Sequence, residues 1–160
     1  MEYPKPALQP PGSEDCEFYA TAYLAGLFGH TVNPDAVKEY LETERITGCG
    51  YLMDKLQMRP AWTFPGLTGG QGYKLAYSHQ SGYRKWVEAH LEAGFVGLAV
   101  IQLIPRAQHA VVFLSADDGG VLLADSCRGL VRDSWSDILT TKQGHSPGRV
   151  DAWFYLGECV

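Results

Sequence analysis

The pattern of apolar and polar residues changes near the middle of the chain. In the first half apolar residues recur every three or four positions, as in helices, and later they form short runs rich in β-branched residues. Helices are predicted at 16–29, 34–44 and 83–93, and a short one at 51–58. Strands are predicted at 95–103, 107–115, 121–125 and 150–156, with a short one at 74–77. Helices followed by an antiparallel sheet indicate an α+β fold.

The helix that follows Cys16 is apolar on nearly every side, which is typical of a buried helix. Ser13 or Asp15 can cap its first turn, and Gly29 can provide the left-handed residue that ends it. Cys16 lies in the first turn, where the helix dipole favours a thiolate. The cysteine is therefore a candidate nucleophile, and a small core residue is the alternative.

The segments between these elements are punctuated by proline and glycine. Residues 1–12 are proline-rich and predict an extended arm. Residues 60–82 are rich in glycine and aromatic residues, which predicts a long loop of the kind that often carries function. Residues 117–120 predict a hairpin turn, and the stretch between Asp125 and a helical turn at 135–139 is expected to be a loop.

Length and charge exclude several classes of protein. The 160 residues suit a single domain spanning 1–160, with 46% hydrophobic and 19% charged residues. A net charge of −5 without a basic run argues against nucleic-acid binding. There is no apolar segment of about 18 residues that would cross a membrane and no apolar core of a signal peptide. We expect a soluble cytoplasmic protein, with secretion by a non-classical route left open.

The four cysteines form neither a CxxC pair nor a zinc-binding spacing. They are Cys16, Cys49, Cys127 and Cys159. We expect reduced thiols, although two disulfides are possible in a secreted chain. No cofactor and no metal are predicted. A zinc site formed by Cys16, His109 and Asp125 is a weaker alternative, because no local pair of ligands supports it.

One histidine and one aspartate lie at the ends of predicted strands. His109 begins a strand within an apolar run, and Asp125 ends the next strand across the hairpin turn. Antiparallel pairing makes them neighbours within reach of a hydrogen bond. The alternative roles are a satisfied core histidine and a turn carboxylate that bonds near Cys127 or Arg128. A base oriented by a third group is what a nucleophilic cysteine requires.

The order of helix-capping cysteine, strand histidine and strand-end aspartate resembles the papain-like cysteine peptidases, most closely the bacterial C39-type domains. The resemblance covers most of the chain and implies a papain-like fold. In that fold an N-terminal helical half with a buried central helix packs on an antiparallel sheet, here of four or five strands. It also implies roles for four residues. Cys16 would be the nucleophile, His109 the base and acid, Asp125 the group that orients His109, and Gln9 a donor to the oxyanion.

Three positions depart from the family pattern. Glu17 follows the cysteine where the family usually has glycine, and its carboxylate is expected to raise the pKa of the thiol. Gln9 is one residue further from the cysteine than is usual. Gln108, beside His109, could compete for contacts within the site.

The predicted activity is cleavage of a peptide or amide bond in a peptide or protein substrate, through a cysteine thioester. The aromatic residues Trp62, Phe64 and Tyr73 are candidates for the substrate-binding wall, together with Glu17 and Gln108. A deamidase or a transglutaminase would use the same triad. A non-catalytic inhibitor, effector or host-interaction module on the same fold is the alternative from another class.

Overall fold

The computed structural model describes residues 2–59, 73–74, 80–104, 107–139 and 150–155. For 73–74, 80–83, 100–104, 107–108, 139 and 150–155 it describes the backbone only. The helices are α1 (Cys16–Leu27), α2 (Pro34–Glu44), α3 (Gly48–Gly50), α4 (Gln80–Glu92) and α5 (Trp135–Leu139), and a π-helical turn, η1, spans Tyr51–Lys55. The strands are β1 (Tyr73–Lys74), β2 (Val96–Ile104), β3 (Ala107–Asp117), β4 (Gly120–Asp125), β5 (Gly129–Ser134) and β6 (Val150–Tyr155).

The strands form one sheet in the order β1-β6-β2-β3-β4-β5, and every neighbouring pair is antiparallel. The last strand, β6, therefore lies between β1 and β2 rather than at an edge. Helices combined with an antiparallel sheet make an α+β fold, as the hydrophobic pattern predicted. The described residues contain six strands where four or five were expected.

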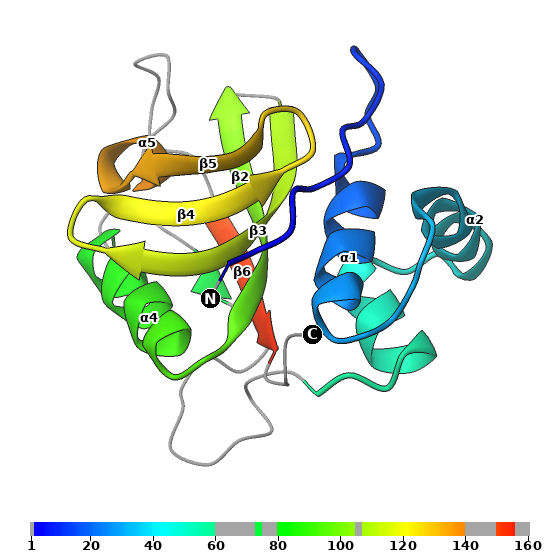
Figure 1. Ribbon diagram of the computed structural model, residues 1–160, viewed down its shortest axis with the longest axis horizontal. Helices are drawn as coiled ribbons and strands as arrows, with labels where there is room; N and C mark the ends of the chain where they lie inside the picture. The colour runs from blue at the N-terminus through cyan, green and yellow to red at the C-terminus, as the bar shows by residue number, and fades with distance from the viewer. Residues whose placement is uncertain (1, 60–72, 75–79, 105–106, 140–149, 156–160) are drawn as a thin grey trace.

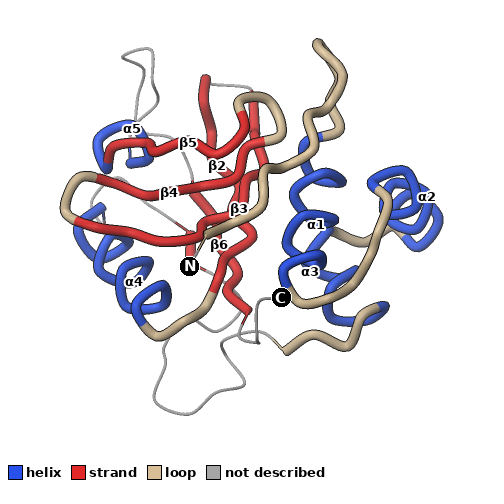
Figure 2. The backbone as a smooth tube through the Cα atoms, in the orientation of Figure 1, coloured by secondary structure: helices blue, strands red, loops and turns tan. Residues whose placement is uncertain are grey.

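Helices cover both faces of the sheet. In Figure 1, α1, α2 and α3 lie together on one side and α4 and α5 on the other, and Figure 2 shows the same separation by element type. Helix α1 packs on β2, β3 and β4, while α4 packs on β2 and β3 and also contacts α5. The sheet is therefore the middle layer, and its central strands have no face turned to water.

Residue parity along the strands decides which layer each side chain joins. In β3, Val111 and Phe113 belong to the apolar cluster under α4 and α5, while Val112 and Leu114 belong to the cluster under α1. The strand reads as a continuous apolar run because both of its faces are buried. His109 has the same parity as Val111, at the beginning of this strand.

Half of the twelve residues of helix α1 are buried, in line with its apolar composition: Ala20, Thr21, Ala22, Leu24, Ala25 and Leu27. Gly29 has a positive φ of 88°, so the expected left-handed residue follows the helix. The predicted side-chain cap is wrong. Asp15 is the N-cap residue but its side chain makes no capping hydrogen bond, and it lies 3.5 Å from the Lys38 ammonium of α2 instead.

The middle helices differ from their predicted boundaries. Residues 48–50, which lie between two predicted helices, form helical turn α3, capped by Thr47, whose hydroxyl accepts from the Gly50 N–H at 3.3 Å. Helix α4 begins at Gln80, three residues before its predicted start at 83. Asn33 caps α2, because its side chain accepts from the Asp35 N–H at 2.8 Å.

The expected loop after Asp125 is wrong, because residues 129–134 form strand β5. This strand pairs with β4 along its whole length, from Asp125 opposite Gly129 to Gly120 opposite Ser134. A side chain at Gly120 would collide with the backbone oxygen of Asp133, so only glycine allows this close pairing. An edge strand with mixed polarity lacks the apolar run that marks the central strands.

The N-terminal arm is extended, as its prolines predicted, and it is held at three points. The Tyr3 hydroxyl donates to the Leu114 carbonyl of β3 at 3.2 Å, and the Tyr23 hydroxyl of α1 donates to the Pro4 carbonyl at 2.8 Å. The Gln9 N–H donates to the Ser126 carbonyl at 2.9 Å. The arm therefore runs beside α1 and β3 (Figure 1) and brings Gln9 to the end of β4.

Candidate active site

Cys16 is the first residue of α1 and its sulfur contacts the beginning of β3. The Ala110 N–H donates to the Cys16 sulfur at 3.5 Å, across 94 positions of sequence. A thiol at the N-terminus of a helix meets the positive end of the helix dipole and the free N–H groups of the first turn. The side chain is partly exposed, so a reactant can reach it.

His109 and Asp125 are directly hydrogen-bonded. The His109 Nε2 lies 2.7 Å from the Asp125 Oδ1, and the two side chains are 10% and 1% exposed. Val112 pairs with Ala124, so extending that register by one residue puts Asp125 opposite Val111 and diagonal to His109. The expected contact across the two strands is present. Because Nε2 faces Asp125, Nδ1 is the ring nitrogen left for the thiol.

The electrostatics of these three groups are those of a thiolate–imidazolium pair held by a carboxylate. Burial raises the pKa of the Cys16 thiol, but hydrogen bonds from His109 and from the Ala110 N–H outweigh burial, and the pKa is lowered. Burial lowers the pKa of His109, but hydrogen bonds to Asp125 and Cys16 raise it to about 9. The charged form of each group therefore stabilises the other.

Asp125 has more partners than the sequence predicted. Its Oδ1 also accepts from the Cys127 N–H at 2.8 Å, and its Oδ2 lies 2.6 Å from the Arg128 Nε. Burial raises the pKa of Asp125, but the donors from His109, Cys127 and Arg128 outweigh it and hold the pKa far below its usual range. A turn carboxylate and a partner of His109 are alternative predictions for Asp125, and its side chain makes both kinds of hydrogen bond.

Sequence reasoning missed Asp133 and did not assign Arg128 to the site. The Arg128 Nη1 and Nη2 lie 2.9 and 2.8 Å from the two carboxylate oxygens of Asp133 in β5. Asp133 is buried although it lies on an edge strand. The only signal in the sequence was an arginine three residues after one aspartate and five before another, and the missed strand β5 concealed its meaning.

Gln9 is buried beside the end of β4, where its N–H bonds to Ser126, the residue after Asp125. In the sequence it lies in the arm that precedes Cys16. Its Nε2 donates to the Ser13 carbonyl at 2.8 Å and to the Ser13 hydroxyl at 3.1 Å, and its Oε1 accepts from the Ser126 hydroxyl. Gln9 thus links the loop before Cys16 to the residue after Asp125. To donate to an oxyanion, one of its N–H bonds would have to turn away from Ser13.

The Glu17 carboxylate is directed at another helix. Its Oε1 accepts from the Gly48 N–H at 2.7 Å, at the first residue of α3. What Glu17 contributes to the thiol is its backbone N–H, a donor that lowers the pKa of Cys16. We expected the Glu17 carboxylate to raise the pKa of the thiol, but this carboxylate is not among the groups that shift the pKa of Cys16. Its predicted contact with substrate stays a prediction.

The remaining predicted substrate-binding residues are described incompletely. Trp62 and Phe64 lie outside the described residues. The backbone of Tyr73 pairs with Ala152 at the start of β1, and the backbone of Gln108 pairs with Gln102 in β3. Their side chains also lie outside what the structure describes, so their contacts with substrate stay predictions.

Two of the candidate catalytic residues, with a second cysteine, form a group whose side chains could hold a metal ion. His109, Asp125 and Cys127 present ligand atoms within 4.8 Å of one another. This set replaces the predicted thiol, Cys16, with Cys127. Both oxygens of Asp125 already accept hydrogen bonds, one of them from the cationic Arg128, and a metal ion would have to displace these donors. The contacts favour the hydrogen-bonded triad.

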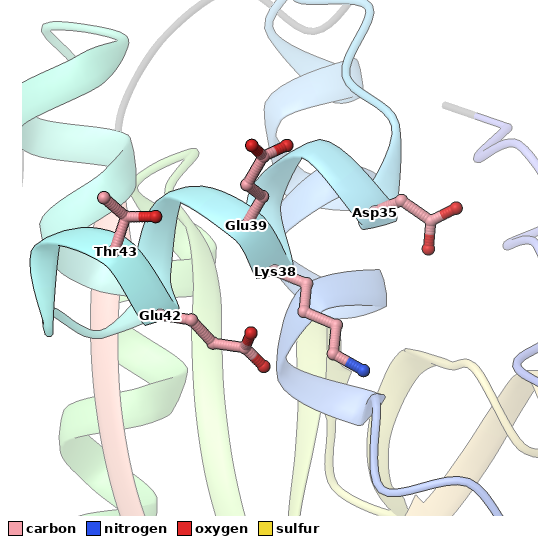
Figure 3. Close-up of a pocket in the computed structure, with 5 residues that line it drawn as sticks. All are labelled: Asp35, Lys38, Glu39, Glu42 and Thr43. Carbon is pink, nitrogen blue, oxygen red and sulfur yellow. The ribbon is translucent and has the colours of Figure 1, made fainter.

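A hollow of about 350 Å³ lies elsewhere, on the outer side of α2. Its lining residues are Asp35, Lys38, Glu39, Glu42 and Thr43, and Figure 3 shows them along one side of the helix. This spacing of three and four residues is the solvent face of an amphipathic helix. The hollow includes none of the candidate catalytic residues.

No family model matches the chain, and no curated protein matches it significantly. Among the described residues, no helix has both the length and the apolar character needed to span a membrane. The candidate function therefore depends on the geometry of the residues themselves.

Proposed function

We propose that the chain is a thiol-dependent hydrolase of the papain-like class that cleaves a peptide or amide bond through a cysteine thioester. One observation carries the proposal, namely the hydrogen bond between His109 and Asp125 beside the Cys16 thiol, whose sulfur accepts from the N–H of Ala110, the residue after His109. The helix terminus that carries Cys16 is far in the sequence from the two hairpin strands that carry His109 and Asp125. A nucleophile, a base and a group that orients the base are the parts that such a reaction requires.

The reaction begins with attack of the Cys16 thiolate on the carbonyl carbon of the substrate. The oxyanion that forms is stabilised by the Cys16 backbone N–H and by the amide of Gln9, once one of its N–H bonds turns from Ser13. His109, protonated through its pairing with Asp125, then gives a proton to the leaving nitrogen as the C–N bond breaks. A thioester on Cys16 remains.

The second half of the reaction uses the same residues in the opposite direction. His109 is neutral after it has protonated the leaving group, so it can remove a proton from water. The resulting hydroxide attacks the thioester carbon, and the acid product leaves as the Cys16 thiolate and the imidazolium form again. An amine in place of water would make the reaction a transfer, and a side-chain amide as substrate would make it a deamidation.

The test is digestion of a mixed peptide library, read by mass spectrometry, with Cys16→Ala as the matched control. The account expects new peptide termini with the wild type and none with the variant. Addition of a primary amine distinguishes hydrolysis from transfer, because a transferase would give amide products instead. Cleavage that persists in Cys16→Ala would contradict the proposal.

The non-catalytic binding module stays the second candidate, because one contact favours it. The Gln9 amide nitrogen donates to two acceptors in Ser13, which withholds a donor that the oxyanion requires. On this account Gln9→Ala would loosen the arm without changing the reactivity of Cys16. On the hydrolase account the same variant slows turnover by about 10²-fold or more.

A further inference from the structure

Arg128 joins two carboxylates that belong to different strands. Its Nε lies 2.6 Å from the Asp125 Oδ2, and its two terminal nitrogens bind both oxygens of Asp133. The Asp125 and Asp133 side chains are 1% and 5% exposed, while Arg128 itself is 36% exposed. Two buried carboxylates and the arginine between them therefore form a charged network, and one of these carboxylates, Asp125, is the partner of His109.

Arg132 of β5 provides a comparison, because it forms an ion pair that is exposed at the surface. The Arg132 Nη1 lies 2.7 Å from the Asp117 Oδ2, and these side chains are 48% and 58% exposed. Such exposed pairs contribute little, whereas a buried carboxylate that loses its partner is strongly disfavoured. The Arg128 contacts therefore fix side-chain geometry in a way that the Arg132 contact does not.

We propose that Arg128, itself held by Asp133, is a positioning residue that fixes the Asp125 carboxylate in the orientation that faces His109. With Arg128 on Oδ2, rotation of the carboxylate would break this bond and also the bond from the Cys127 N–H to Oδ1. Because the two terminal nitrogens of Arg128 donate to Asp133, its Nε is the nitrogen that donates to Asp125. Without Asp133, the guanidinium can turn two nitrogens toward Asp125 and compete with His109.

The inference rests on the proposed function for its consequence, but its test does not depend on turnover. The groups that face His109 are Asp125 from β4, the Cys16 thiol from α1, and the nearby Cys127 thiol. Replacing Cys16 with serine removes the nucleophile and leaves the bond between His109 and Asp125 available for measurement. Every variant in which the His109 titration is measured also carries Cys16→Ser.

The first experiment measures the titration of the His109 imidazole by NMR in Asp133→Asn, with Asp117→Asn as the matched control. Loss of the Asp133 charge removes a nearby anion and frees Arg128, and both effects lower the pKa of His109, by about 1 pH unit. The control variant is expected to leave the titration unchanged. An unchanged titration in folded Asp133→Asn would overturn the proposal, whether or not the wild type ever cleaves a substrate.

The second experiment keeps the charge and removes the planar fork. Arg128→Lys retains a cation, but a single ammonium cannot bind both carboxylates in this geometry. We expect alkylation of Cys16 by iodoacetamide at pH 6 to slow by about fivefold, with Arg132→Lys as the unaffected control. A rate equal to that of the wild type would mean that charge alone matters and would overturn the positioning role.

Discussion

In the part of the chain that the structure describes, two histidines are buried, and they differ in their contacts. His90 of α4 is 1% exposed and His109 of β3 is 8% exposed, so burial alone does not separate them. The His90 Nδ1 lies 2.7 Å from the Trp86 carbonyl of its own helix, and its ring packs against Trp86 and Phe95. His109 contacts a carboxylate from β4 and a thiol from α1.

This comparison indicates that the partners of a buried histidine, rather than its burial, decide whether it is a candidate catalytic residue. The His90 Nδ1 lies near a carbonyl four residues away in its own helix, and the ring packs against Trp86 and Phe95. His109 bonds to a carboxylate 16 positions away, and the N–H of the next residue, Ala110, bonds to the Cys16 thiol across 94 positions. These contacts meet at the beginning of β3, where a reactant can reach the thiol. Substitutions at the two histidines and at their partners should separate these two roles.

The largest difference is expected between His109→Ala and His90→Phe. Without His109 the Cys16 thiol should behave as an ordinary thiol, of which about 0.3% is ionised at pH 6. Alkylation at that pH should fall by about 100-fold. In His90→Phe the rate should be unchanged and the unfolding free energy lower by about 1 kcal/mol. Equal rates for His109→Ala and the wild type would remove the catalytic role.

Replacing the carboxylate partner should give the next largest effect. Asp125→Asn leaves Arg128 and His109 without their shared anion, which should lower the unfolding free energy by about 3 kcal/mol at pH 7. It should also slow Cys16 alkylation at pH 6 by about tenfold, because the imidazolium is less stable. Denaturant titration and peptide mass spectrometry measure these quantities. A stable variant with unchanged alkylation would show that Asp125 is only a turn residue.

The pH dependence of stability should reveal the pairing of Cys16 with His109. The pKa of His109 is raised to about 9, so its contribution is fully present below about 6.5 and is lost as the pH rises toward 9. In the wild type the proton that Cys16 releases compensates for the proton that His109 retains, and the slope between pH 6.5 and 8.5 is small. In Cys16→Ser the compensation is gone, and stability should fall by about 1–2 kcal/mol over that range.

The control for this slope is Cys16→Ser combined with His109→Gln, in which the decline should disappear. Denaturant titration at four or more pH values measures it. A decline of the same size in the wild type and in Cys16→Ser would show that Cys16 stays protonated in the folded state.

The smallest effect is expected at Glu17. Its carboxylate accepts from the Gly48 N–H, and Glu17→Gln keeps an acceptor there while losing the charge. Stability should fall by less than about 1 kcal/mol, and the pH profile of Cys16 alkylation should not move. Acceleration of alkylation at pH 6 by tenfold or more would restore the expectation that this carboxylate opposes thiolate formation.

The elements that position the triad could be predicted because each has a strong local pattern. The apolar helix after Cys16, the run that includes His109 and the strand that ends at Asp125 are all regular segments with clear ends. The contact between His109 and Asp125 followed from a short hairpin, in which register is set by the turn. The α+β class followed from the order of these segments.

The rest depends on contacts between distant residues. Strand β5 is a mixed-polarity edge strand, and missing it concealed the pairing of Asp133 with Arg128. The contact between Glu17 and Gly48 closes 31 positions of sequence, and the anchoring of Gln9 by Ser126 closes 117. Side-chain hydrogen bonds at such separations have no periodic signature in the sequence.

The most direct test of the thiolate–imidazolium pair is the alkylation rate of each cysteine against pH in the wild-type protein, read by peptide mass spectrometry. Burial and the charge of Asp125 raise the pKa of Cys127, so this neighbouring thiol serves as an internal control. We expect Cys16 to react fastest near pH 6, with an inflection well below about 8.5. An inflection of Cys16 near 8.5, like that of an ordinary thiol, would contradict the hydrolase proposal.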